Sequence, residues 1–283
     1  MNIFEAILLG LIQGVTEFLP ISSSGHCTLT GKLLGIISET DPARWTNFIA
    51  VIQLGTLIAV IVYFWGDIIN IIQSFIKENL VHRKKYREQD MNSKLGWLII
   101  FGTIPIVIVG LLFRHQIEGT FTKNLLVIAG SLIGLAILLG IAEKYASFKK
   151  NMKDLTWKEA VVIGIAQTFA LIPGSSRSGT TLTGGLFMGL NRETAARFSF
   201  LLSIPAVFAS AILELKEALH AGLNSQDILN YIVATIVAGI SGYFSIDFLL
   251  RYLRKNSTFV FIYYRLILGI VIMVLLYLNV INP

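Results

Sequence analysis

Long apolar runs alternate with short polar segments along the whole chain. A run needs about 20 residues to cross a lipid bilayer as a helix, and six runs are long enough. They cover residues 47–65, 96–113, 124–142, 198–215, 229–250 and 260–281. We therefore predict six membrane-spanning helices.

Two further apolar runs are interrupted by proline, serine and glycine. One runs into the segment Pro-Ile-Ser-Ser-Ser-Gly-His, and the other into Pro-Gly-Ser-Ser-Arg-Ser-Gly. A short apolar segment follows each break, too short to span a membrane alone. The paired segments are 3–21 with 27–37, and 160–172 with 181–190. This pattern predicts two re-entrant hairpins, because non-helical backbone at membrane depth is tolerated only where protein or a wet cavity surrounds it.

The two interrupted regions also resemble each other. At a constant offset of 154, eight of the 30 positions from 6 to 35 are identical, among them Gln13 with Gln167 and Ser22 with Ser176. That is several times the roughly two identities expected by chance from this composition. The similarity indicates an internal duplication.

The duplication predicts one all-α membrane domain over residues 1–283, built from two halves, 1–145 and 155–283. Each half contains one re-entrant helical hairpin and three transmembrane helices. Because three is an odd number, the halves must lie in opposite orientations. This is an inverted-topology repeat, and its functional site is expected near the midplane, where the broken helices meet.

The composition agrees with a membrane protein. Hydrophobic residues make up 54% of the chain and charged residues 14%, and the mean hydropathy is +0.72. Soluble domains carry roughly 25% charged residues, so this chain could not cover a water-facing surface. A nucleic-acid-binding protein, a disordered scaffold and a secreted disulfide-rich domain are excluded. The single cysteine, Cys27, provides neither an internal disulfide nor a cysteine metal cluster.

The distribution of positive charge predicts the orientation. Sixteen basic residues fall on the face formed by the loops 66–95 and 143–159 and the neighbouring helix ends, whereas five fall on the opposite face. Cytoplasmic loops carry the excess of Lys and Arg, so the first face is expected in the cytoplasm. Both termini and the mouth of the first hairpin are then expected outside.

Arg177 lies within the second break, and an arginine at membrane depth usually marks a function. Small neighbours such as Gly174, Ser176 and Ser178 let backbone N–H groups converge at the start of a half-helix, which suits an anion. The guanidinium adds a planar fork that matches phosphate oxygens. The alternative is that Arg177 only pairs with a buried carboxylate. Arg265, inside the last span, is interpreted first as a structural pairing partner, with a functional role as the alternative.

The first break supplies complementary groups. Glu17 lies in an apolar run, and Ser22, Ser23 and His26 crowd the break. By the repeat, Ser23 is equivalent to Arg177, so a hydroxyl should face a guanidinium. Glutamate, serine and histidine together offer a base, a nucleophile and a proton shuttle. Alternatively, Glu17 is only the ion-pair partner of Arg177, and His26 is a core histidine.

Three segments resemble the motifs of one family. The segment from Gln13 to Glu17 resembles an (E/Q)xxxE motif, residues 18–26 resemble FLPxSSxGH, and residues 173–181 match PGxSRSxxT. These are motifs of the bacterial undecaprenyl-diphosphate phosphatases, also called bacitracin-resistance proteins. The resemblance extends over essentially the whole chain.

The resemblance implies an enzyme of the bacterial inner membrane that hydrolyses the C55 polyprenyl diphosphate to the monophosphate, the carrier lipid of cell-wall synthesis. Glu17 would be the motif acid, Ser23 the nucleophile or a hydroxyl ligand, and His26 the acid/base. The residues expected to bind phosphate are Ser22, Gly174, Ser176, Arg177, Ser178 and Thr181.

The family also implies a divalent cation, Mg²⁺ or Ca²⁺, near Gln13 and Glu17. Because Gln occupies position 13, one motif carboxylate is present instead of two, which disfavours a paired-carboxylate metal site more than it disfavours hydrolysis. A phosphoserine intermediate and direct attack by water both stay open, as does the oligomeric state, a homodimer included. The rival class is a transporter, such as a flippase for the lipid monophosphate that uses the same midplane anion site.

Overall fold

The protein is all-helical over the residues that the structure describes, 1–38, 42–220 and 225–282. In this computed structural model, six of the described helices are long and apolar enough to cross a membrane. They are α3 (Pro42–Tyr63), α5 (Met91–Leu112), α7 (Leu125–Tyr145), α10 (Arg192–His220), α11 (Ser225–Leu253) and α12 (Phe259–Tyr277). The six predicted spans are confirmed.

Several of these helices begin earlier than their apolar runs, and in α5 and α10 a polar side chain caps the earlier start. α5 begins at Met91 rather than at 96, since the Asp90 carboxylate accepts a hydrogen bond from the Ser93 N–H at 2.7 Å. α10 begins at Arg192 rather than at 198, and the Asn191 side chain accepts from the Thr194 N–H at 2.8 Å. Each cap adds a polar first turn that hydropathy alone does not detect.

The two interrupted regions form two pairs of short helices. The first pair is α1 (Ile3–Phe18) and α2 (Ser23–Leu33), and the second is α8 (Trp157–Thr168) and α9 (Arg177–Phe187). The residue before each second helix has φ in the left-handed region, +76° at Ser22 and +68° at Ser176. Each of these serines accepts a hydrogen bond from the glycine N–H three residues later. Positions 154 residues apart therefore share one unusual cap.

All but the last of the shorter helices lie near the two ends of the bundle, and the last lies in the second break. They are α4 (Trp65–Ile76), the π-helix η1 (Lys77–Val81), η2 (Tyr86–Glu88), α6 (Arg114–Glu118), η3 (Thr120–Lys123), η4 (Met152–Asp154) and η5 (Phe169–Leu171). Of these, α6 and η3 connect α5 to α7, and η1 and η2 connect α4 to α5.

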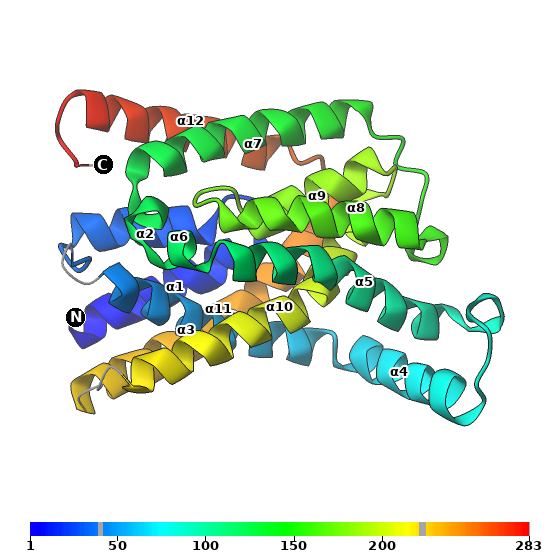
Figure 1. Cartoon of the computed structure of the whole chain (residues 1–283). Coiled ribbons are helices and arrows are strands. Elements are labelled where there is room, and N and C mark those ends of the chain that lie inside the picture. Colours follow the sequence, from blue (N-terminus) through cyan, green and yellow to red (C-terminus); the bar gives the residue numbers. More distant parts are fainter. Residues whose placement is uncertain (39–41, 221–224, 283) are drawn as a thin grey trace.

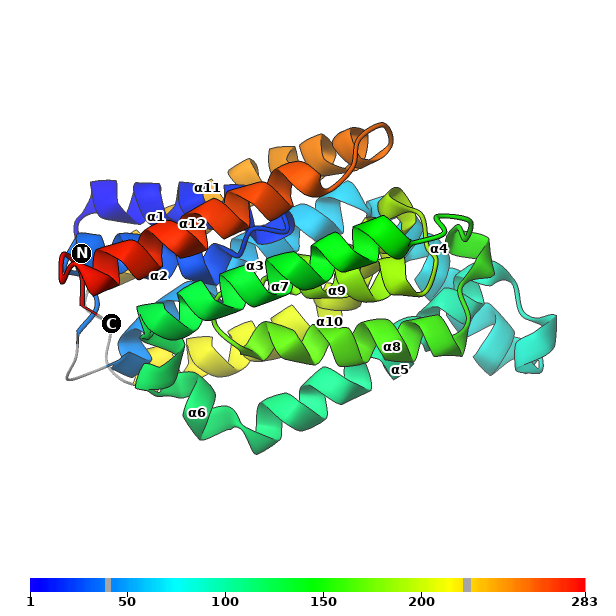
Figure 2. The ribbon, with the colours of Figure 1, turned by 90° about the horizontal axis from the view of Figure 1, so that it is seen from above.

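The helices run roughly parallel to one another, with both termini at one end of the molecule (Figure 1). α1 packs against α11, α7 against α12, α5 against α8, and α3 against α10 and α11. The first pair, α1 and α2, starts and finishes at the end that carries the termini, whereas α8 and α9 reach the interior from the opposite end (Figures 1 and 2). The two breaks therefore lie inside the bundle.

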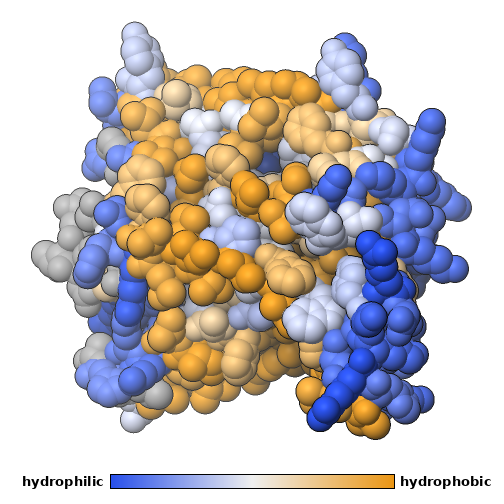
Figure 3. Space-filling model, turned by 45° about the vertical axis from the view of Figure 1, so that its right-hand side comes forward, coloured by the Kyte–Doolittle hydropathy of each residue, from blue (hydrophilic) through white to orange (hydrophobic). Residues whose placement is uncertain are grey.

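The surface agrees with a membrane environment. In Figure 3 a wide apolar band lies between hydrophilic patches at the two ends. Large apolar side chains are exposed along the long helices, for example Ile240 (59% exposed), Phe244 (66%) and Leu112 (71%). A water-soluble protein would bury such a band, so this is the architecture of a multi-pass membrane protein.

Candidate active site

The two breaks touch each other inside the bundle. The Ser178 hydroxyl, in the first turn of α9, donates to the Leu19 carbonyl at 2.9 Å and approaches the Glu17 carbonyl at 3.3 Å. The Gly174 N–H donates to the Ser24 hydroxyl at 3.5 Å. Residues that are about 150 positions apart in sequence are thus brought together, as the sequence predicts.

Glu17 is the common acceptor of a polar cluster that forms where the two breaks touch. Its Oε2 accepts hydrogen bonds from Gln13 Nε2 at 2.7 Å and from the Ser23 hydroxyl at 2.6 Å. Its Oε1 accepts from Arg177 Nη2 at 2.7 Å. Gln13 and Glu17 are one turn apart on α1, while Ser23 and Arg177 are the first residues of α2 and α9. Glu17 is only 5% exposed, so the ion pair is largely shielded from water.

The cluster has the groups needed to activate a hydroxyl and to hold a phosphate. Because Ser23 donates directly to a carboxylate, Glu17 is placed to accept the serine proton as a general base. Arg177 uses Nη2 on Glu17, but its Nη1 is buried and has no hydrogen-bond partner among the described residues. A buried donor without a partner is costly, so this nitrogen is suited to a ligand oxygen.

A cavity of about 240 Å³ adjoins the cluster. Glu17, Ser23, Ser176 and Arg177, all predicted site residues, line this cavity. Further polar lining residues are Ser24, Thr28, Thr46, Gln53, Thr122, Lys123 and Ser210, and apolar ones include Trp45, Ile49, Ile106, Ile117 and Val207. A charged headgroup and the start of an apolar chain could therefore occupy the same cavity.

The other predicted phosphate-binding residues hold the loops instead of lining this cavity. Ser22 caps α2, and Ser178 ties the two breaks together. Thr181 donates to the Arg177 carbonyl at 2.7 Å and also contacts the Ser199 hydroxyl. Gly174 has φ +85° and lies against α7, where the Ser131 side chain leaves no room for a Cβ atom.

His26 is turned away from the Glu17 carboxylate. Its Nδ1 is 2.7 Å from the Ser22 carbonyl and its Nε2 is 2.6 Å from the Tyr264 hydroxyl. The two rings are stacked, with 7° between their planes. His26 does not line the cavity, so the structure brings Glu17, Ser23 and Arg177 together without it. The proton-shuttle role of His26 stays a prediction.

Arg265 on α12 forms hydrogen bonds to both breaks and does not line the cavity. It is fully buried and donates to the carbonyl oxygens of Pro20, Ser131, Gly174 and Ser175, at 3.4, 3.4, 3.4 and 2.9 Å. The expected pairing therefore takes place with backbone carbonyls of both breaks. An arginine on α12 thus connects the backbone of the two breaks.

Among the cavity residues that were not identified from the sequence, Lys123 carries a charge and Gln53 an amide. Lys123 is only 5% exposed, and its Nζ donates to Thr46 Oγ1 at 2.5 Å and to the Gly119 carbonyl at 2.8 Å. In the sequence Lys123 stands just before an apolar run, where a basic residue at the membrane surface is common. Gln53 is a polar residue within α3, and this interruption of an apolar run was the available signal.

The described residues do not form a protein-held metal site. They contain no group of three or more His, Cys, Asp or Glu side chains placed to share an ion. Among the described residues, Glu17 is the only carboxylate that lines the cavity, and both its oxygens already accept hydrogen bonds. Gln13 donates to that carboxylate through its amide. These residues by themselves therefore lack a ligand set for the expected cation.

The chain is similar to known proteins over nearly its whole length. The family model of the bacitracin resistance protein BacA matches residues 6–271. A protein of Syntrophobacter fumaroxidans named undecaprenyl-diphosphatase is 54% identical over 269 residues, covering 95% of both chains. Proteins of the same name from Chloroherpeton thalassium (51% identical, covering 98% of this chain and 97% of the relative) and Pelodictyon phaeoclathratiforme (50%, covering all of both) are similar over the same length. The chain belongs to the BacA family of bacitracin resistance proteins.

Proposed function

We propose that this protein hydrolyses undecaprenyl diphosphate to undecaprenyl phosphate and inorganic phosphate, and so recycles the carrier lipid of cell-wall synthesis. The names of its relatives support this reaction. The observation that carries it is the Glu17 carboxylate, which accepts hydrogen bonds from Ser23 and Arg177 at the wall of one cavity.

The reaction is a phosphoryl transfer, in which the protein mainly positions groups and stabilises charge. In one route the Ser23 oxygen attacks the terminal phosphorus and gives its proton to Glu17, the phosphoanhydride bond breaks, and water later hydrolyses the phosphoserine. In the other route Glu17 takes the proton of a water that attacks directly. In both routes the lipid monophosphate leaves, and Arg177 Nη1 donates to a phosphoryl oxygen whose charge grows in the transition state.

The substrate lies with its headgroup against Arg177 and its first isoprene units along the apolar lining of the cavity, near Ile49 and Val207. Arg177 shares its charge with Glu17, so a diphosphate benefits from a second cation. Lys123 lines the same cavity and fills this role.

Detergent-purified protein tests the reaction, because no membrane gradient exists there. We expect one inorganic phosphate and one undecaprenyl monophosphate per diphosphate consumed, measured by phosphate assay and by mass spectrometry of the lipid. Intact substrate after incubation with folded protein would contradict the proposal. A flippase needs only a group that binds the anion, so a transporter would not explain the hydrogen bond between Glu17 and Ser23. The names of the relatives do not favour a transporter either.

The two halves, 1–145 and 155–283, are proposed to form an inverted-topology repeat with one re-entrant hairpin each. The matching caps at Ser22 and Ser176, and the entry of the helix pairs from opposite ends of the bundle, support this arrangement. The midplane position of the site then follows from the meeting of the two breaks.

Both termini and the mouth of the cavity are proposed to lie outside the cytoplasm of the bacterial inner membrane, so that the enzyme serves lipid on the outer leaflet. The charge bias of the loops supports this orientation. Single cysteines at Arg44 and at Arg87, in a Cys27→Ala background, test it with a membrane-impermeant thiol reagent on intact cells. Labelling at 44 alone is expected, and labelling at 87 alone would place the mouth in the cytoplasm.

A further inference from the structure

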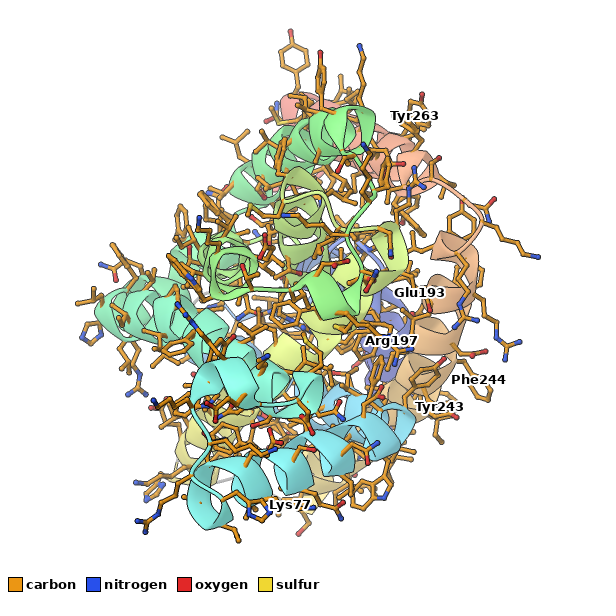
Figure 4. All side chains as sticks on the ribbon, turned by 90° about the vertical axis from the view of Figure 1, so that its right-hand side faces the viewer. Lys77, Glu193, Arg197, Tyr243, Phe244 and Tyr263 are labelled. Atoms are coloured by element: carbon orange, nitrogen blue, oxygen red, sulfur yellow. The ribbon has the colours of Figure 1, made fainter. Side chains whose placement is uncertain are left out.

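A second cavity, of about 620 Å³, lies at the opposite end of the molecule from the termini. It is formed by the α4–α5 connection, the first turns of α5, and α8. Its lining residues are Asn79, Lys84, Tyr86, Gln89, Trp97, Phe101, Trp157 and Val161. None of them lines the catalytic cavity. Figure 4 views the molecule from this end, with the labelled Lys77 marking the end of α4.

A hydrogen-bonded network gives this cavity a fixed shape. The Asn79 side-chain oxygen accepts from Trp97 Nε1 at 3.0 Å and from Gln89 Nε2 at 2.8 Å. The Asn79 amide nitrogen donates to the Phe75 carbonyl at 2.8 Å and to the Ser93 hydroxyl at 3.1 Å. Asn79 belongs to the π-helix η1, and π-helical turns are rare and frequently occur at functional sites.

The walls of the cavity change from polar to apolar along α5. Trp97 and Phe101, one turn apart, stack with their ring centroids 5.9 Å apart. Trp157 and Val161 form the facing wall on α8, and Trp157 is 57% exposed. Tryptophan and tyrosine favour the boundary between hydrocarbon and headgroups. The cavity thus lies where the headgroup and the upper chain of a lipid meet.

The segment around this cavity carries a net positive charge. Between residues 77 and 94 the chain has six Lys and Arg against three Asp and Glu. Glu78 is already paired with Lys84 at 2.7 Å, and that bond lowers the pKa of Glu78. Lys94 and Lys158 each lie over a lining ring, of Tyr86 and Trp157 respectively, 5.9 Å from the centroid. The net charge therefore favours an anion.

We propose that this cavity binds one anionic phospholipid, such as phosphatidylglycerol, with its phosphate near Lys94 and Lys158 and its upper acyl chain against Trp97 and Phe101. Cations near a membrane surface attract anionic lipids, whereas a zwitterionic headgroup gains little of this attraction. The site is separate from the phosphatase reaction and does not rest on it.

Native mass spectrometry of the delipidated full-length protein, titrated with phosphatidylglycerol or phosphatidylcholine, tests the site. We expect one phosphatidylglycerol to bind at least roughly tenfold more tightly than phosphatidylcholine. The double variant Lys94→Gln, Lys158→Gln should lose roughly tenfold in this affinity. Lys94 and Lys158 lie over two rings of the lining, whereas Lys149 and Lys153 are exposed and outside it. The matched control, Lys149→Gln with Lys153→Gln, therefore removes the same charge away from the cavity and should change affinity less than about twofold.

Three outcomes would overturn the proposal. Equal losses in the two double variants would mean that binding follows surface charge and not this cavity. Equal affinity for both lipids would contradict the anionic specificity. Displacement of the lipid by excess inorganic phosphate would mean a site for free phosphate. Phosphate release from undecaprenyl diphosphate serves as the check of folding, since Lys94 and Lys158 do not line the catalytic cavity.

Discussion

Arg177→Lys separates a phosphate clamp from a simple counter-ion. In the wild-type protein, Arg177 uses Nη2 on Glu17 and has a second buried nitrogen, Nη1, without a partner. Lysine keeps the positive charge but has a single nitrogen, so it can neutralise Glu17 or hold the phosphoryl group, and it cannot do both with the same geometry. If Arg177 only balances the charge of Glu17, lysine should be an adequate replacement.

The expected loss follows from one missing donor. Removing a preorganised donor to a charge that develops in the transition state costs roughly 100- to 1,000-fold in kcat, or about 2.7–4 kcal/mol. We expect kcat/KM for phosphate release by purified Arg177→Lys to fall by roughly 100-fold or more. Arg251→Lys is the control, because Arg251 forms an exposed pair with Asp247 at the surface and should stay within about twofold of wild type.

The reasoning would be refuted by near-normal turnover of a folded Arg177→Lys protein. Folding is measured by thermal unfolding in detergent, because the ion pair with Glu17 is buried and its disruption alone can cost about 3–5 kcal/mol. A variant that retains the melting temperature and loses activity confirms the clamp. A variant that retains both confirms the alternative, in which Arg177 is only a counter-ion.

Three further predictions follow from the same contacts. Glu17→Gln combined with Ser23→Ala should be little worse than the worse single variant, because the two act as one unit; multiplied losses in kcat/KM would show independent roles. Lys123→Ala should raise KM roughly tenfold with kcat nearly unchanged, and Lys123→Arg should restore KM, since the expected role is charge and not chemistry; an unchanged KM refutes it. Arg265→Lys should destabilise the protein by about 1–3 kcal/mol, because carbonyls of both breaks lose a donor; an unchanged melting temperature contradicts this bridging role.

The membrane-spanning helices can be predicted from the sequence because each of them needs a continuous run of apolar residues. Each span appears as an apolar run, and each break contains the proline, glycine and serine residues that end one helix and cap the next. The repeat makes Ser23 equivalent to Arg177 and predicts that the two lie close together, and in the structure both donate to the Glu17 carboxylate. The ion pair of Glu17 with Arg177 was the alternative interpretation of these two residues.

Contacts between unrelated segments could not be predicted in this way. His26 meets Tyr264, 238 residues away, and nothing near His26 in the sequence indicates that partner. Arg265 binds backbone carbonyls, which every residue has, so composition cannot identify its partners. Lys123 enters the cavity because α6 and η3 fold back over the end of α3, where its ammonium reaches Thr46. These positions depend on packing between helices and not on local pattern.

Turnover of Glu17→Gln tests the central claim most directly, because Glu17 alone touches Gln13, Ser23 and Arg177. Single-turnover phosphate release from undecaprenyl diphosphate is compared for the wild-type and variant proteins, both checked by thermal unfolding. General-base catalysis contributes roughly 100- to 10,000-fold, so the folded variant should release phosphate at least about 100-fold more slowly. A folded Glu17→Gln protein that releases phosphate at the wild-type rate would contradict the account.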